Sequence, residues 1–143
     1  AVNIVIAPKI GRLIQRFGER KSLIFEYIGL AFIFIGYAFV ESGYFAVFLY
    51  IADHLFFSIA IALKTYFQKI ADPADFASSA GVSFTINHIA AVFIPVVFGL
   101  IWLYSPSLVF LAGAGMACIS LLLAFNMPSE PSSGNEVLLG KFS

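Results

Sequence analysis

The stretch PKIGRLIQRFGERK, residues 8–21, contains five of the eight basic residues of the chain, and apolar segments leave it in both directions. Its basic residues are Lys9, Arg12, Arg16, Arg20 and Lys21. Pro8 readily ends a helix, because its ring removes a backbone donor and restricts the preceding residue. Gly11 and Gly18 allow a sharp bend, and Ser22 is a residue type that caps helices. The stretch therefore predicts a tight basic turn between two membrane helices.

The spacing within this turn resembles the loop signature of major facilitator superfamily transporters, G-x-x-x-D-[RK]-x-G-x-[RK]-[RK]. The family carries it between the second and third helices and, in weaker form, between the eighth and ninth. Residues 11–21 keep every fixed position but one, and the kept positions are Gly11, Arg16, Gly18, Arg20 and Lys21. The departure is Gln15, where the family usually has an Asp that caps a neighbouring helix and takes part in a cytoplasmic gate. The alternative is a generic basic turn that follows the positive-inside rule.

Composition places the chain in a membrane. Hydrophobic residues make up 61% of it and charged residues 11%, with a mean hydropathy of +0.97. A soluble domain has about 45–50% apolar and about 25% charged residues. We therefore expect an all-α integral membrane protein. The net charge of zero removes any electrostatic argument for nucleic acid.

The sequence contains no pattern typical of an enzyme. Cys118 is the single cysteine, so disulfides within the chain are excluded and nothing favours a cysteine-based metal site. Zinc-ligand spacing, a phosphate-binding glycine loop and a nucleophile–base arrangement are all missing from the sequence. We expect no enzymatic activity, no cofactor and no metal.

Four stretches are long enough to cross a bilayer, which takes about 20 helical residues. We expect spans at residues 22–40, 44–63, 80–103 and 107–127. Residues 1–8 are expected to be the end of a partial helix, which makes residues 1–127 one helical bundle. Residues 64–79 are expected to form a polar connection, and 128–143 a disordered polar tail. Because the chain opens on Ala1 inside an apolar run, we expect a fragment whose upstream helices are missing.

Two local features sharpen this division. Asp72, Pro73 and Asp75 predict a helix start, with Asp72 at the cap, Pro73 in the first helical position and Asp75 in the first turn. Gly29 and Gly36 lie seven residues apart on one helix face, where small residues let two membrane helices approach closely.

The distribution of charge predicts the orientation. With the basic turn in the cytoplasm, all eight Lys and Arg residues and the tail lie inside, and the two external turns contain none. We expect a multi-pass protein of a bacterial inner membrane. The weaker form of the signature and the short polar tail favour the carboxy-terminal half of a transporter, helices eight to twelve; helices two to six are the alternative.

The resemblance implies a twelve-helix fold of two six-helix bundles around a central cavity, each built from inverted three-helix repeats. It also implies a partner, the missing amino-terminal half. In the family the ninth and twelfth helices are peripheral, whereas the tenth and eleventh line the cavity.

Ionisable groups deep in a membrane helix are functional candidates. In span 44–63, Asp53 and His54 lie with Tyr50 in one polar arc of about 140°. Asp53 is about 13 Å below Tyr44, close to the midplane. We expect these residues to bind a proton or a polar substrate group. An interhelix hydrogen bond is the alternative.

Span 80–103 carries a second polar group, formed by Asn87 and His88. His88 lies about 12 Å inside the membrane from Ala80. Cavity lining and a hydrogen bond to a neighbouring helix are both open for this pair. Glu26, by contrast, is near the basic turn, and we expect it to pair with Arg20, Lys21 or the helix dipole.

We expect secondary active transport of a small solute by alternating access, coupled to protons. One alternative is a dimeric four-helix exporter of the small multidrug-resistance type. Exporters of this type that insert in both orientations need Lys and Arg balanced between the two sides of the membrane. In this chain all eight are expected on one side. The other is a membrane anchor or assembly subunit without transport, which gives no reason for polar residues at the midplane.

The orientation is open to direct test. Single cysteines introduced at Ser42 and Ser105, in a Cys118→Ala background, should react with an impermeant maleimide added outside intact cells. A cysteine at Ser132 should be protected until the membrane is opened. Labelling of position 132 from outside would contradict the orientation.

Overall fold

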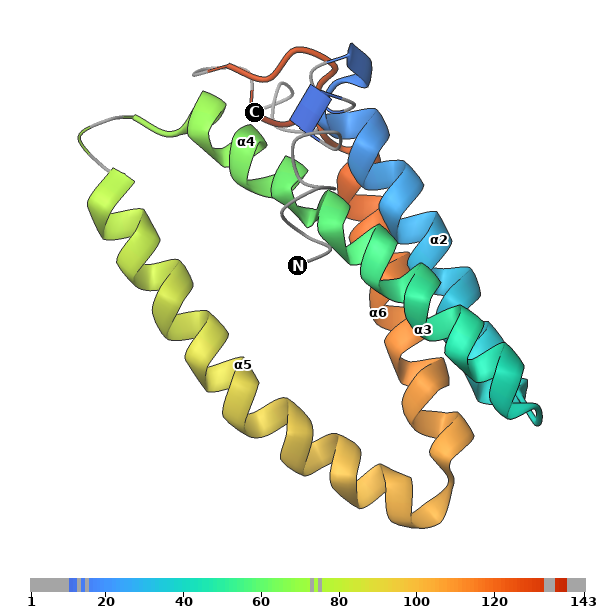
Figure 1. Ribbon diagram of the computed structural model, residues 1–143. Helices are drawn as coiled ribbons and strands as arrows, with labels where there is room; N and C mark the ends of the chain where they lie inside the picture. The colour runs from blue at the N-terminus through green and yellow to red at the C-terminus, as the bar shows by residue number, and fades with distance from the viewer. Residues whose placement is uncertain are drawn as a thin grey trace.

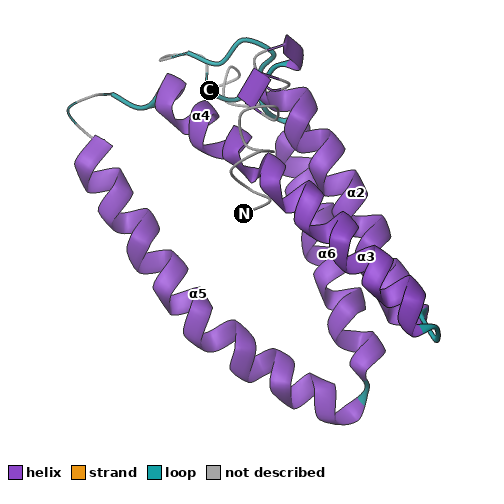
Figure 2. Ribbon diagram, viewed as in Figure 1, coloured by secondary structure: helices purple, strands orange, loops and turns teal. Residues whose placement is uncertain are grey.

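The computed structural model describes residues 11–12, 14, 16–72, 74, 76–132 and 136–138. Every element in this part is helical: α2 (Glu19–Phe39), α3 (Gly43–Phe57), the short 3₁₀ helix η1 (Ser58–Ala60), α4 (Ile61–Ile70), α5 (Phe76–Tyr104) and α6 (Pro106–Phe125) (Figure 2). Four helical runs are long and apolar enough to cross a membrane: Glu19–Phe39, Gly43–Ile70, Ala77–Tyr104 and Pro106–Phe125. The chain is an all-α, multi-pass membrane protein, as expected. The expected partial helix at 1–8 lies outside the described residues.

Helix α2 is the centre of the bundle, with α6 packed along it and α3 and α4 beside it (Figure 1). At one end, Ser107 Oγ donates a hydrogen bond to the carbonyl of Ala38 at 2.7 Å. Further along, the rings of Tyr37 and Phe110 stack with centroids 5.0 Å apart. At the other end, Arg20 donates to the Phe125 carbonyl at 3.0 Å. The two helices are therefore joined from one end to the other.

The close approach of α2 and α3 follows from two glycines, which confirms the expectation for Gly29 and Gly36. A Cβ at Gly29 would overlap the ring of Phe56, and one at Gly36 would lie 3.2 Å from Leu49 Cδ1. Phe56 is also packed on Phe25, with ring centroids 5.2 Å apart. The ring therefore fills the space that a side chain at position 29 would need.

The second span is longer than expected. Helical structure continues from α3 through η1 and α4 to Ile70, so the polar connection does not begin at residue 64. Ile59, Ala62 and Tyr66 are buried at helical spacing, and this periodic burial extends the helix past Lys64. A 3₁₀ segment turns by about 120° per residue rather than about 100°. The polar arc drawn for a regular α-helix therefore does not hold beyond Ser58.

Of the two predicted helix caps, that at Ser22 is wrong. Asp72 Oδ1 accepts a hydrogen bond from the Ala74 backbone N–H at 2.9 Å, as a capping aspartate does, although α5 is helical only from Phe76. Pro73 and Asp75 lie outside the described residues. Helix α2 begins at Glu19, and Ser22 Oγ donates back to the Gly18 carbonyl at 2.8 Å instead of capping the helix start.

The described part of the tail is not disordered, contrary to expectation. The Tyr66 hydroxyl donates to the carbonyl of Glu136. The Leu138 backbone N–H donates to the carbonyl of Asn126 at 2.8 Å, and Pro128 is buried. Tyr66 on α4 and Asn126 at the end of α6 thus find their partners in the tail, a long-range pairing that polar composition does not reveal.

Helix α5 diverges from the other helices. Among the described elements it contacts only α6, to which it is joined by the turn at Ser105 (Figure 1). None of its described residues is buried. Pro95 lies inside α5 without ending it. The turns α2–α3 and α5–α6 lie at one end of the molecule, whereas the α4–α5 connection and the tail lie at the other (Figure 1).

The α2–α3 contact predicts a position-specific effect of adding one methyl group. Gly29→Ala should lower the free energy of unfolding in detergent by about 1–3 kcal/mol, the usual cost of overpacking. Gly115→Ala is the matched control, because a Cβ there meets nothing within 4 Å. Alanine should gain up to about 1 kcal/mol there from helix propensity. Equal effects of the two substitutions would contradict the packing described.

Candidate functional site

The polar group on α3 consists of Tyr50, Asp53 and His54. His54 Nδ1 lies 3.8 Å from Asp53 Oδ2, and the two side chains are 57% and 30% exposed. His54 Nδ1 also lies 3.1 Å from the carbonyl of Tyr50, and the Tyr50 and His54 rings pack with centroids 4.3 Å apart. The three residues thus lie together on one helix, since Tyr50 is one turn before His54 and Asp53 is adjacent to it.

The polar group on α5 repeats the same local geometry. His88 Nδ1 lies 3.0 Å from the carbonyl of Phe84, four residues earlier. The Phe84 and His88 rings lie 3.9 Å apart. Asn87 and His88 are both exposed along this helix.

Each histidine is therefore held in the same tautomer. A backbone carbonyl only accepts hydrogen bonds, so the Nδ1 facing it carries the hydrogen. In that tautomer Nε2 is the hydrogen-bond acceptor of the ring. Nδ1 of His54 donates to the Tyr50 carbonyl, and its distance of 3.8 Å from Asp53 Oδ2 is too long for a hydrogen bond.

The two polar groups are not brought together. Helices α3 and α5 make no contact with each other in the described part of the chain. Asp53 lies ten residues into its span, about 15 Å along the axis from Gly43, and His88 lies about 18 Å from Phe76. Both groups are thus near half depth. His54, Asn87 and His88 are exposed and Asp53 is half-buried, on helices whose exposed surface is mostly apolar.

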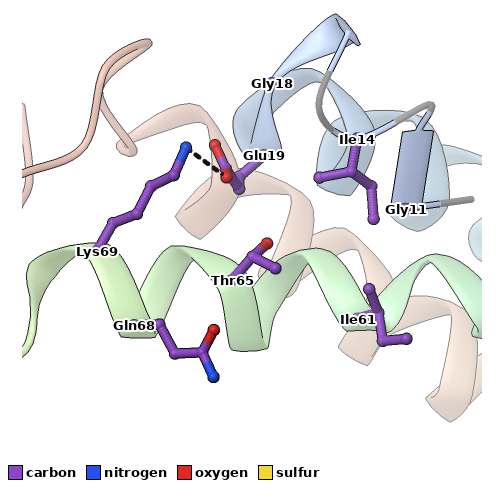
Figure 3. Close-up of a pocket in the computed structure, with 8 residues that line it drawn as sticks. All are labelled: Gly11, Ile14, Gly18, Glu19, Ile61, Thr65, Gln68 and Lys69. Atoms are coloured by element: carbon purple, nitrogen blue, oxygen red, sulfur yellow. Dashed lines mark ion pairs between the residues drawn. The ribbon is translucent and has the colours of Figure 1, made fainter.

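A second polar cluster occupies the end of the bundle that carries the basic turn. Lys69 Nζ on α4 lies 2.6 Å from Glu19 Oε1 on α2, and the Glu19 side chain is only 6% exposed (Figure 3). On the other side of α2, Arg20 donates to the Phe125 carbonyl at 3.0 Å and to Ser129 Oγ at 3.5 Å. The first two residues of α2 therefore connect it to the ends of both α4 and α6.

A pocket of about 400 Å³ opens beside the ion pair. Figure 3 shows its lining, from the basic turn, the start of α2 and one face of α4: Gly11, Ile14, Gly18, Glu19, Ile61, Thr65, Gln68 and Lys69. Because its walls carry one carboxylate, one ammonium, an amide and a hydroxyl, the pocket suits water or a small polar group.

The signature residues of the basic turn differ in their contacts and exposure. Gly18 has a φ of +83°, a conformation that favours glycine. Arg20 satisfies the end of α6. Arg16 and Lys21 are exposed, Gly11 lines the pocket, and Gln15 lies outside the described residues.

Sequence reasoning missed Glu19 and Lys69. Glu19 occupies a variable position of the signature, and Lys69 was assigned to a loop. A signal was nevertheless present, since Glu19, Glu26 and Ile33 repeat every seven residues. All three prove to be buried on α2, and such spacing places residues on one helix face.

The expected pairing of Glu26 with the basic turn is wrong. Arg20 is directed to Phe125 and Ser129. Glu26 is 2% exposed, and its Oε2 has no hydrogen-bond partner among the described residues. It also lies seven residues beyond Glu19, so it is outside the first turn of α2, where the helix dipole acts.

Within the described residues, no group of three or more His, Cys, Asp or Glu side chains is placed to hold a metal ion. No protein family, curated protein or solved structure matches this chain.

Proposed function

We propose that the chain is part of a secondary active transporter that moves a small solute by alternating access, coupled to protons. The observation that carries the proposal is the pair of polar groups at half depth: Asp53 with His54 on α3, and Asn87 with His88 on α5. The side chains of His54, Asn87 and His88 are exposed and that of Asp53 is half-buried, on helices long and apolar enough to span a bilayer. A polar or charged group facing hydrocarbon costs several kcal/mol, so these groups require a polar cavity.

The chemistry of the groups suits proton coupling. Asp53 and the free Nε2 of both histidines are proton acceptors. Aromatic rings beside each histidine, Tyr50 and Phe84, add apolar surface for a solute. Such a mixture of apolar walls and few polar groups is typical of small-molecule sites.

The basic turn and the distribution of polar residues support the resemblance to the major facilitator superfamily. Helices α2 and α6 carry no exposed charge at half depth, as suits the peripheral ninth and twelfth helices of a carboxy-terminal half. Helices α3 and α5, which carry the polar groups, then correspond to the tenth and eleventh. The partner that completes the cavity is a second six-helix bundle, the amino-terminal half.

The basic residues also support an inner-membrane location with the basic turn in the cytoplasm. Helix α4, which carries Lys64 and Lys69, lies toward the same end of the molecule as the start of α2, which carries Arg20 and Lys21 (Figure 1). Such one-sided Lys and Arg follow the positive-inside rule. They do not favour a dimeric exporter that inserts in both orientations.

Asp53→Asn tests the proposal. The substitution keeps the size of the side chain and part of its hydrogen bonding but removes the carboxylate. In vesicles containing the complete transporter, with a solute identified by the proton flux that it elicits from the wild type, accumulation driven by a pH gradient should be abolished. The amount of protein in the membrane should be unchanged.

Glu41→Gln is the matched control, because Glu41 is exposed in the α2–α3 turn. This variant should accumulate solute at the wild-type rate. If Asp53 only hydrogen-bonds to another helix, asparagine replaces it at a cost of about 0.6 kcal/mol. Normal pH-dependent accumulation by Asp53→Asn would therefore remove Asp53 from the coupling site.

A further inference from the structure

Glu26 is the most deeply buried charged residue of the described chain. It is 2% exposed, and its Oε2 atom has no hydrogen-bond partner among the described residues. An unpaired carboxylate in such surroundings costs several kcal/mol unless it acquires a proton or a cation. Glutamine or leucine would avoid that cost, so the position calls for an explanation beyond packing.

The alignment of α2 with α3 places Glu26 opposite η1, the short 3₁₀ segment that follows α3. Gly36 of α2 faces Leu49 of α3. Gly29, seven residues earlier on α2, faces Phe56, seven residues later on α3. The two helices are therefore antiparallel and keep one register between these contacts. Three further residues bring Glu26 level with Ile59, the middle of η1. Helix α2 does contact η1, and Ile59 is buried. Short 3₁₀ stretches inside longer helices often mark hinges.

The surroundings favour a proton over a metal ion as the ligand. Ca²⁺ takes six to eight oxygen ligands, and Mg²⁺ needs near-octahedral coordination. The described residues offer no cluster of three acidic, histidine or cysteine side chains. A proton needs a single oxygen. We propose that the Glu26 carboxylate is a proton-binding site, separate from Asp53, which exchanges protons with the aqueous phase at the end of the bundle that carries the basic turn.

The pocket beside Glu19 supplies the direction of access. Its lining reaches from Gly18 and Glu19 down one face of α4 to Ile61, two residues from Ile59. Glu26 lies on the same face of α2 as Glu19, about 10 Å deeper at the helical rise. Water in the pocket therefore comes closest to Glu26 from that end.

Other titratable groups near this part of α2 do not pair with Glu26. Glu19 and Tyr27 lie on α2, Lys64, Tyr66 and Lys69 on α4, Asp53 and His54 on α3, and Cys118 on α6. Lys69 is taken by Glu19, the Tyr66 hydroxyl by Glu136 and His54 by Tyr50. No described ion pair involves Glu26. Protonation and deprotonation of Glu26 therefore proceed without a fixed counter-charge.

The proposal rests on the proposed function only in that the bound ion is a proton. Its test requires no measurement of transport. Dicyclohexylcarbodiimide adds to a protonated carboxyl group in an apolar environment and leaves a stable N-acylurea, with no leaving group. The complete protein, in native membranes, is treated with this reagent at pH values from about 5 to about 9, and adducts are mapped by peptide mass spectrometry. The adduct at Glu26 should fall at least about tenfold between the two ends of this range.

Glu19 is the internal control, because its carboxylate is held by Lys69 in an ion pair and should carry no adduct. Infrared difference spectra over the same range should show a neutral-carboxyl band that disappears at alkaline pH and is missing in Glu26→Gln. Both signals should persist in Asp53→Asn, even where that variant no longer accumulates solute. Either no adduct at Glu26 at any pH, or an adduct and band that do not change with pH, would overturn the proposal.

Discussion

The hydrogen bond from Arg20 to the Phe125 carbonyl closes the bundle on its α2–α6 side. The last four carbonyls of a helix have no partner within the helix, and in or near a membrane such groups must be satisfied. Arg20 meets that need for the Phe125 carbonyl of α6, and its positive charge is also favourable at a helix C-terminus. Glu19, the preceding residue, reaches Lys69 in the last turn of α4. One turn of α2 thereby fixes the ends of two other helices.

Such polar contacts matter more here than in a soluble protein, because lipid is as apolar as the helix surfaces and does not drive them together. The remaining cohesion comes from close packing. Gly29 and Gly36 bring α3 onto α2, while Ser107 and Tyr37 join α2 to α6 at the opposite end. Helix α5 has none of these devices against α2 or α3, and it accordingly diverges from them. Its exposed His88 and the exposed His54 on α3 are held alike by carbonyls four residues earlier.

The sequence predicted what depends on local composition. Apolar length predicted the four spans, and two glycines at a spacing of seven predicted a close helix contact, which the structure places between α2 and α3. It failed where the outcome depends on residues far along the chain. Lys64 and Lys69 suggested a loop, but burial of Tyr66 and the pairing of Lys69 with Glu19 keep that segment helical. The tail was expected to be disordered, yet Tyr66 and Asn126 bind it. Glu26 was placed near the surface from its position in the chain, whereas the surrounding helices bury it.

For the candidate site, residue types and depth were predictable, but geometry was not. Asp53 and His54 were identified from polarity alone, and the tautomer of each histidine emerged only from the structure. That α3 and α5 do not meet follows from tertiary packing, which no pattern within either helix reports.

The most direct measurement compares two neighbouring basic residues of the signature. Arg20 donates to the end of α6, whereas Lys21 is exposed and makes no contact of this kind with a described residue. Thermal unfolding of the protein in detergent should show Arg20→Met to be less stable than wild type by about 1.5 kcal/mol, the usual contribution of a hydrogen bond to a charged group. Lys21→Met should unfold like the wild type. Equal stability of the two variants would show that the turn acts only through its charge, and would contradict the role given to the first turn of α2.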